Sequence, residues 1–453
     1  MIHKYRLFDY NIILDVNSGA VHLADDCAFV LLDHITEIMP KECPSEAIQT
    51  LRGEYTVAEI KEAYSELLAL HEEGTLFSKD DCEPFSRLLE NAPIKSMCLN
   101  IAHDCNLRCG YCFASQGDFG QGRKLMPFEV AKAAIDYLIE YSGKRINLEL
   151  DFFGGEPLLN FETVKETVEY ARSREEETGK RFRFTLTTNG LLLTDDVIDF
   201  INREMSNVVL SIDGRPEVHD KLRQRVGGSG SYDSIVPKYK KLISQRQGKE
   251  YYVRGTYTKL NLDFYNDVLH LLELGFDQIS VEPVLSAEGF PYVISEEDIS
   301  AVFESYEVLA RKLIEKKRRG EGFNFFHFMI DLNGGPCAVK RLRGCSCGNE
   351  YIAVTPDGDI YPCHQFVGQD NWIMGSVMQG TIDNEMKSTF SKANIYAKDT
   401  CKECWARFYC SGGCNAGNAQ INGSILEPYS LSCAIEKKRL ECAIAVKAAL
   451  SGG

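Results

Sequence analysis

The sequence predicts an α/β protein built on a partial barrel of six β–α units, with a smaller module before the barrel and a cysteine-rich part after it. Three observations predict this arrangement. Strand and helix patterns alternate along residues 91–325, and the nearly continuous apolar strands indicate a parallel sheet covered by helices. Ten of the seventeen cysteines lie beyond residue 330. Because a closed eight-unit barrel needs roughly 250 residues, the middle stretch fits an open barrel of six units.

Residues 1–90 predict a winged-helix-like module. Residues 10–34 indicate a hairpin followed by a helix. A second helix begins at Thr56, which forms a capping box with Glu59, and ends near Gly74. Such modules often bind DNA, but a chain with net charge −16 lacks the basic face that phosphate binding needs. We therefore expect this module to recognise a peptide that adds as a strand to the hairpin edge.

The barrel is expected over residues 91–325, with helical segments such as 127–143 and 263–275 between its strands. In such sheets the chemistry gathers at the carboxyl ends of the strands. Residues 326–453 are glycine-rich and poor in apolar periodicity, so metal ligation is expected to hold their shape. The expected strands are 96–102, 146–153, 181–188, 207–213, 251–258 and 278–285.

The compartment follows from targeting signals and cysteine content. The N-terminus lacks a signal-peptide pattern, and no stretch offers the ~18 apolar residues of a membrane helix. We expect a cytoplasmic protein that binds neither membrane nor nucleic acid. Seventeen cysteines in a reducing compartment indicate metal or cluster ligands more than a disulfide framework.

Three cysteines follow the first expected strand, in the segment HDCNLRCGYCFAS at residues 103–115. They are Cys105, Cys109 and Cys112. Closed zinc and iron–sulfur sites usually have four protein ligands. Three thiolates can hold a four-iron cluster and leave one iron open to a small molecule. A zinc site with a distant fourth ligand, or three buried cysteines, is the alternative.

The pattern C-x3-C-x-aromatic-C resembles the radical S-adenosylmethionine (SAM) superfamily. The resemblance implies that the open iron binds the amino and carboxylate groups of SAM. An electron from the cluster then cleaves SAM to a 5′-deoxyadenosyl radical, which abstracts a substrate hydrogen. The residues that this resemblance assigns to SAM binding are Tyr111, Phe113, Gly155, Glu156, Asn189, Ser211 and Arg223.

Each SAM-binding residue has an implied role. Gly155 in FFGGEP lets the backbone approach a ligand, and Glu156 accepts from the methionine ammonium. Ser211 contacts the ribose or the carboxylate, and Arg223 pairs with the carboxylate. The backbone around Tyr111 and Phe113 meets the adenine. Asn189 could instead close its own turn.

A string of seven further cysteines resembles the SPASM extension of the same superfamily, which carries two auxiliary four-iron clusters. A zinc ribbon is the alternative for the C-x2-C and C-x3-C pairs. The resemblance assigns the first auxiliary cluster to Cys345, Cys363 and Cys414. It assigns the second to Cys401, Cys404, Cys410 and Cys433.

The first auxiliary cluster lacks a clear fourth ligand, which could be Cys347, Cys337 or none. Alternate residues of an extended segment point to opposite faces, so Cys345 and Cys347 do not readily share a cluster unless the chain turns. We therefore expect an open iron here that suits a substrate thiolate. His364, after Cys363, is expected to be structural more than a proton acceptor. The remaining cysteines, each more often a small buried residue than a ligand, are Cys27, Cys43, Cys82, Cys98, Cys337 and Cys442.

The order of the three parts resembles the maturases of six-cysteine-in-forty-five precursor peptides. The resemblance implies a thioether between a substrate cysteine sulfur and the α-carbon of another residue. It also implies a leader segment bound by the N-terminal module, and an electron donor such as a flavodoxin or ferredoxin. Formylglycine formation on sulfatases, epimerisation and carbon–carbon crosslinking remain alternatives. A non-catalytic electron carrier or a zinc-stapled adaptor is the alternative from a different class.

Overall fold

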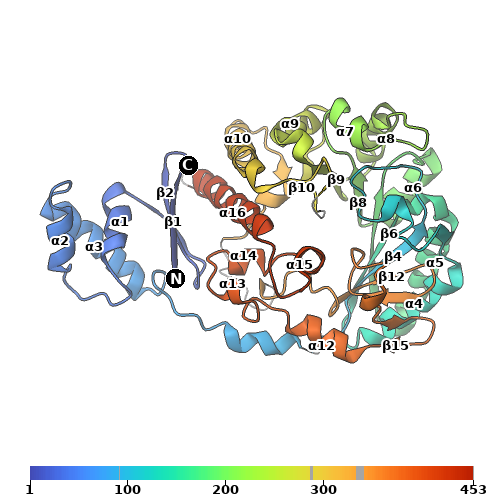
Figure 1. Cartoon of the computed structure of the whole chain (residues 1–453), viewed down its shortest axis with the longest axis horizontal. Coiled ribbons are helices and arrows are strands. Elements are labelled where there is room, and N and C mark those ends of the chain that lie inside the picture. The colour runs from blue at the N-terminus through green and yellow to red at the C-terminus, as the bar shows by residue number, and fades with distance from the viewer. Residues whose placement is uncertain (91, 286–288, 333–340, 452–453) are drawn as a thin grey trace.

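The computed structural model describes residues 1–90, 92–285, 289–332 and 341–451. Figure 1 shows the N-terminal sheet and helices at one end of the molecule and the barrel at the other. The C-terminal part lies between them and along the barrel. Among the described residues, no helix is both long enough and apolar enough to cross a membrane.

The six expected parallel strands are confirmed. They form one sheet in the order β10-β9-β8-β7-β6-β4, with neighbours parallel throughout. Their bounds are β4 (Ser96–His103), β6 (Asn147–Gly154), β7 (Arg181–Thr188), β8 (Asn207–Ser211), β9 (Glu250–Tyr257) and β10 (Gln278–Pro283). Two short strands join the sheet, β5 (Lys124–Leu125) beside β4 and β11 (Asn324–Phe325) beside β10.

Helices cover the outer face of this sheet (Figure 1). Alternate strand residues such as Phe182, Phe184 and Leu186 on β7 belong to the main hydrophobic core. The intervening residues, such as Thr185 and Thr187, face the inside of the half-barrel and are only partly buried. The helices are α4 (Phe128–Tyr141), α5 (Phe161–Thr178), α6 (Asp195–Glu204), α7 (Pro216–Leu222), α8 (Tyr232–Ser244), α9 (Phe264–Glu273) and α10 (Ile299–Arg318).

The C-terminal part continues the barrel sheet, which the sequence did not reveal. Strand β12 (Tyr351–Val354) pairs parallel to β4, and three antiparallel strands follow it. These are β13 (Asp359–Tyr361), β14 (Gly375–Ser376) and β15 (Thr381–Ile382). The helices are α12 (Asn384–Lys392), α13 (Asp399–Lys402), α14 (Arg407–Cys410), α15 (Asn415–Asn422) and α16 (Ser430–Ser451). Helix α16 was not predicted, because the cysteine-rich sequence around it was interpreted as loop.

The N-terminal module holds a three-stranded antiparallel sheet and three helices. Its order is β1-β2-β3, so β3 is an edge strand, and β1 was missed by the sequence analysis. The capping box of Thr56 and Glu59 is present at the start of α3, and Gly74 follows its end with φ of 75°. The elements are β1 (Ile2–Leu7), β2 (Tyr10–Asp15), β3 (Val21–Ala24), α1 (Asp26–Leu31), α2 (Ser45–Leu51) and α3 (Val57–Glu72).

The N-terminal sheet is packed on both faces. Ile12 and Leu14 on β2 belong to the main core, whereas Ile13 between them belongs to the core of the N-terminal helices. On β1, Tyr5 donates its hydroxyl to the carbonyl of Glu441 on α16, at 2.9 Å. The module is therefore tied to the C-terminal helix and not attached by a free linker alone.

We predict that Thr56→Ala weakens the first turn of α3 by about 1 kcal/mol, because the Glu59 N–H loses the Thr56 hydroxyl that accepts from it. Hydrogen exchange of the amides at the start of α3 should become faster. Thr50→Ala is the control, since Thr50 lies inside α2 and donates to the carbonyl of Glu46 instead of capping a helix. Equal exchange in both variants would contradict the capping role.

Candidate active site

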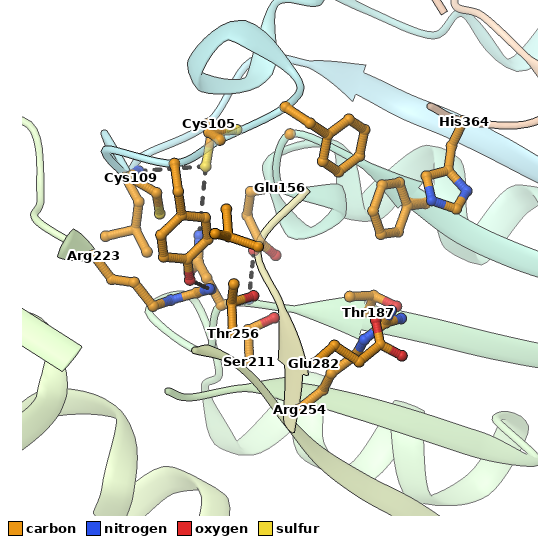
Figure 2. Close-up of a pocket in the computed structure, with 18 of the residues that line it drawn as sticks. Cys105, Cys109, Glu156, Thr187, Ser211, Arg223, Arg254, Thr256, Glu282 and His364 are labelled. Atoms are coloured by element: carbon orange, nitrogen blue, oxygen red, sulfur yellow. Dashed lines mark hydrogen bonds and ion pairs between the residues drawn. The ribbon is translucent and has the colours of Figure 1, made fainter. Parts of the chain in front are cut away.

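One cavity opens at the carboxyl ends of the barrel strands, and Figure 2 shows the residues around it. Its volume is about 240 Å³. The three cysteines of the loop after β4 line it, as do all seven residues that the resemblance assigned to SAM binding. The structure thus brings together ten residues that are spread over more than one hundred positions of the sequence.

Two glycines after β6 allow the cysteine loop to approach the sheet. Gly155 donates its N–H to the carbonyl of Ala102 at 2.8 Å, and Glu156 donates to the carbonyl of Asp104 at 2.9 Å. A Cβ added at Gly155 would lie 2.2 Å from that carbonyl oxygen of Asp104, and one at Gly154 only 2.3 Å from the oxygen of Ala102. No side chain fits in this space, so the glycines hold the backbone beside the first cysteine.

Glu156 is a buried carboxylate with three donors around it. Oε1 accepts from the Leu158 N–H at 3.1 Å and the Thr188 hydroxyl at 2.8 Å, and Oε2 accepts from the Asn189 N–H at 2.8 Å. Burial raises its pKa to about 7, although these hydrogen bonds oppose the shift. Its position in the cavity suits acceptance of one further donor, such as an ammonium group.

The thiol of Cys105 is also buried. Burial and the nearby charge of Glu156 raise its pKa to about 12, and burial raises the pKa of Cys109 to about 11. A thiol with such a pKa keeps its proton at neutral pH. Binding of a metal cluster by these cysteines would therefore release protons.

A buried hydrogen-bonded group joins the cysteine loop to the end of β8. Tyr111 donates its hydroxyl to Asp213 Oδ2 at 2.6 Å, and Arg223 Nη1 donates to the Tyr111 hydroxyl at 2.8 Å. Arg223 Nη1 lies 3.6 Å from Asp213 Oδ1. The sequence analysis missed Asp213, although it lies two residues after Ser211, which the resemblance assigned to SAM binding.

Arg223 retains a spare donor. Its buried Nε has no hydrogen-bond partner among the residues that the structure describes. A buried guanidinium with an unpaired donor at a cavity wall fits a carboxylate of a bound molecule. The glycine-lined approach, the three thiols and this arginine together fit SAM and its cluster, so Cys105, Cys109 and Cys112 would hold that cluster.

Asn189 performs the structural role that the sequence left open, and it also contacts the cysteine loop. Its Oδ1 accepts from the Leu191 N–H at 3.1 Å, which closes the turn after β7. Its Nδ2 donates to Asn106 Oδ1 at 2.7 Å and lies 3.6 Å from the sulfur of Cys105. Asn189 therefore holds the loop against the strand end.

The opposite wall of the cavity was not predicted. Arg254 on β9 donates to Glu282 on β10 at 2.5 Å, and Figure 2 shows this pair away from the cysteines. His364 lies beside them, with its ring centroid 4.8 Å from that of Phe153. Burial lowers the pKa of His364 to about 4, so the ring is neutral at pH 7. Its Nδ1 lies 3.1 Å from the Tyr351 hydroxyl.

Four thiols lie near one another in the first C-terminal set, and Cys347 is one of them, which the sequence analysis did not expect. Side-chain hydrogen bonds link Cys347 to both Cys345 and Cys363, and the charge of Cys345 acts on Cys414. The chain turns at Ser346, where φ is 55°, so Cys345 and Cys347 do not point to opposite faces. Cys337 lies outside the described residues.

The four cysteines expected for the second auxiliary cluster lie near one another. The charges of Cys401 and Cys404 act on Cys433, and that of Cys433 acts on Cys410. Among the cysteines expected to be small buried residues, Cys27, Cys98 and Cys442 are buried, whereas Cys43 and Cys82 are partly exposed.

A buried lysine lies between the two C-terminal sets. Lys398 Nζ donates to the carbonyl of Gly412 and to Asn415 Oδ1, both at 2.7 Å. Burial lowers its pKa, while cysteines of both sets oppose the shift. Asn415 Nδ2 in turn lies 3.6 Å from the sulfur of Cys347.

The candidate metal ligands at all three cysteine sites are thiols. In the described part of the chain, no three His, Cys, Asp or Glu side chains are arranged around a single metal ion. A four-iron cluster binds each cysteine through a different iron, so it does not require the sulfurs to converge on one point.

Comparison with known families is consistent with this geometry. Residues 99–279 match the Radical SAM superfamily, and residues 345–405 match SPASM, an iron–sulfur cluster-binding domain. The chain is a radical SAM protein with a SPASM domain. The α/β fold expected from the sequence is confirmed.

Two curated relatives show the range of similarity. An uncharacterised protein of Methanocaldococcus jannaschii is 29% identical over 42% of this chain and 62% of its own length, so less than two thirds of that relative is matched. The cysteine-type anaerobic sulfatase-maturating enzyme of Clostridium novyi is 26% identical over 69% of this chain and 85% of its own length.

Two solved structures have similar folds. The structure of anSMEcpe with bound AdoMet and the Cp18Cys peptide has a TM-score of 0.64 at 22% identity, over 80% of this chain and 100% of its own. The structure of Streptococcus suis SuiB bound to S-adenosylmethionine has a TM-score of 0.54 at 16% identity, over 95% of this chain and 98% of its own.

We predict that Gly155→Ala reduces binding of the cluster at Cys105, because the new methyl group displaces the backbone of Asp104. The reconstituted variant should contain less iron and sulfide than the wild type. Gly53→Ala is the matched control, since nothing lies within 4 Å of a Cβ at Gly53 and no unusual φ is recorded there. A full iron content in Gly155→Ala would contradict the close approach.

We also predict that Cys347→Ala lowers the iron and sulfide content and alters the electron paramagnetic resonance spectrum of the reduced protein, because the first C-terminal set loses one of four thiols. Cys98→Ala is the control, since Cys98 is buried and belongs to neither C-terminal set. An unchanged spectrum with unchanged iron would instead support a cluster with only three cysteine ligands.

Proposed function

We propose that this enzyme installs an intramolecular thioether, from a cysteine sulfur to the α-carbon of another residue, in a ribosomally made, cysteine-rich precursor peptide. The observation that carries this proposal is the cavity with two unlike walls. The wall with the three thiols and the SAM-binding candidates serves the cofactor, and the polar wall of Arg254, Glu282 and His364 remains for a substrate.

An open half-barrel suits a long substrate. In closed barrels, bulky branched side chains fill the interior. Here the inward positions of β9 and β10 carry Arg254 and Glu282, whose side chains are 50% and 36% exposed. A peptide segment can therefore lie along the inner face of the sheet while one of its residues reaches the cavity.

The proposed reaction is a two-electron oxidation of the peptide. When bound, SAM and its cluster supply the one-electron chemistry that removes a hydrogen atom from the α-carbon. The cysteine thiol loses its proton, the sulfur–carbon bond forms, and one electron passes to an oxidised iron–sulfur cluster. Tyr111 and Asp213 would keep Arg223 oriented toward the cofactor, and Glu156 would accept from its ammonium group.

We propose that the three parts of the chain divide this work. Residues 91–325 carry the radical site, and residues 1–90 bind the leader of the precursor, with the β3 edge as the docking strand. Residues 326–453 hold two auxiliary four-iron clusters, which makes three clusters in all. A cytoplasmic location and a flavodoxin or ferredoxin as electron donor remain predictions.

The C-terminal thiols bear on the expectation that the first auxiliary cluster has an open iron. Four thiols at the first auxiliary set favour Cys345, Cys347, Cys363 and Cys414 as a full set of ligands. With no vacant iron at that cluster, we propose that it accepts the electron and that the substrate sulfur binds elsewhere in the cavity.

Maturation of a sulfatase, by formylglycine formation, is the second candidate, because the Clostridium novyi relative is named a cysteine-type anaerobic sulfatase-maturating enzyme. The same cofactor wall would serve a hydrogen abstraction from the β-carbon of a cysteine. The products differ, since formylglycine loses the sulfur and contains an aldehyde, whereas a thioether retains the sulfur.

We predict that a synthetic six-cysteine-in-forty-five precursor peptide, incubated with reconstituted enzyme, SAM and reductant, loses two hydrogens and one alkylatable thiol. Mass spectrometry after alkylation measures both changes, and a leaderless peptide is the control for recognition. An aldehyde product would favour formylglycine formation. An unchanged mass in ordinary water, together with uptake of deuterium from heavy water, would show epimerisation.

A further inference from the structure

The Arg254–Glu282 ion pair lies in the cavity and not on the outer surface. In the sheet register Arg254 is opposite Ser280, and Glu282 is opposite Thr256, so the pair joins neighbouring strands diagonally. Exposed pairs of this kind contribute little to folding, typically below about 1 kcal/mol. Stabilisation of the sheet is therefore a weak reason for a charged pair at this position.

The pair is held from behind by buried groups. His327 Nε2 lies 3.8 Å from Glu282 Oε1 and 3.2 Å from the Ser280 hydroxyl. On the other side of the ring, Nδ1 of His327 is 3.0 Å from Arg439 Nη1 on α16. These buried groups lie behind the pair, and the bond from Arg254 holds the Glu282 carboxylate at the cavity.

The protonation states follow from the same packing. Burial alone would raise the pKa of Glu282, but the charge of Arg254 and of basic groups behind it outweighs burial and lowers the pKa. Glu282 is therefore an acceptor at neutral pH. The Arg254 guanidinium has more N–H groups than the one that it gives to Glu282.

A fixed donor beside a fixed acceptor matches the backbone on either side of an α-carbon. The carbonyl of a residue accepts from an arginine, and the N–H of the same residue donates to a carboxylate. A residue held in this way presents its α-hydrogen whatever its side chain. Abstraction at an α-carbon requires this kind of positioning, because the reacting atoms must approach to about 3–3.5 Å.

We propose that Arg254 and Glu282 are substrate-positioning residues, which bind the carbonyl and N–H of the peptide residue that loses its α-hydrogen. This inference rests on the proposed function and deepens it. The enzyme then selects the reacting residue by its position along the bound peptide, and side chains of different size are accepted there. The rings of Phe113, Phe153 and His364 pack against one another and also line the cavity.

The experiment compares Arg254→Met, Glu282→Gln and the double swap Arg254→Glu/Glu282→Arg. The swap retains an ion pair but exchanges the donor and the acceptor. The matched control is Arg183→Glu/Glu250→Arg, a pair of the same type at 3.1 Å that involves the first residue of β9 and does not line the cavity.

The readouts separate positioning of the substrate from folding and from cofactor chemistry. For each variant we would measure thermal unfolding, 5′-deoxyadenosine formation without peptide, and KM and kcat with the synthetic precursor peptide. A peptide deuterated at the α-carbons reports hydrogen transfer as deuterium in 5′-deoxyadenosine. Binding of the labelled peptide without reductant, measured by fluorescence anisotropy, does not depend on which product forms.

We expect the swap to unfold like the wild type, and its deuterium transfer is expressed relative to its own rate of 5′-deoxyadenosine formation without peptide. We also expect peptide binding at least about tenfold weaker and little deuterium transfer, since one charged hydrogen bond is worth about 1.4 kcal/mol or more. Normal peptide binding and deuterium transfer in the swap would overturn the inference. If the wild type binds peptide and forms no thioether, the proposed function fails. Weaker peptide binding by the variants would still support the positioning role of Arg254 and Glu282.

Discussion

The site depends on one backbone contact, in which the end of β6 passes directly against the chain that leaves β4. The N–H groups of Gly155 and Glu156 donate to the carbonyls of Ala102 and Asp104, and the next residue is the first cysteine of the loop. A side chain at Gly154 or at Gly155 would overlap these carbonyls. The two strand ends are therefore held at a separation that only glycine permits. The same crossing brings the Glu156 carboxylate into the cavity, so cluster ligands and a cofactor-binding candidate are positioned by a single constraint.

Buried charges then connect this crossing to the rest of the barrel. Tyr111 extends from the cysteine loop to Asp213 after β8, and Arg223 closes the group from the end of α7. Buried groups of this kind are costly when a partner is missing and specify one arrangement when all are present. On the opposite wall, His327 and Arg439 connect Glu282 to α16, which also contacts the N-terminal sheet. Helix α16 therefore lies behind the cavity wall proposed for the substrate, and it also contacts the module proposed to bind the leader.

Much of the fold could be predicted from the sequence because the barrel strands are apolar, periodic and separated by recognisable helices. The cysteine loop was found because its ligands are close together in the chain. Other features carry no local signal: Asp213 and Glu282 look like ordinary polar residues at strand ends, and their importance comes from partners tens of residues away. The position of Cys347 near Cys345 was not predicted, because the turn at Ser346 uses a positive φ in a residue other than glycine, which sequence patterns do not reveal.

The C-terminal part shows how a cysteine-rich segment can be organised before any cluster is considered. Lys398 donates to the carbonyl of Gly412, which lies between Cys410 of the second set and Cys414 of the first, and to Asn415, which contacts Cys347. A buried ammonium is tolerated only where acceptors surround it, and both acceptors here lie in the segment that joins the two sets. Since four-iron clusters bound by thiolates carry net negative charge, a cation at this junction would reduce the repulsion between them. The lysine therefore holds the two cysteine sets in a fixed relative position, and its charge would favour the two auxiliary clusters proposed there.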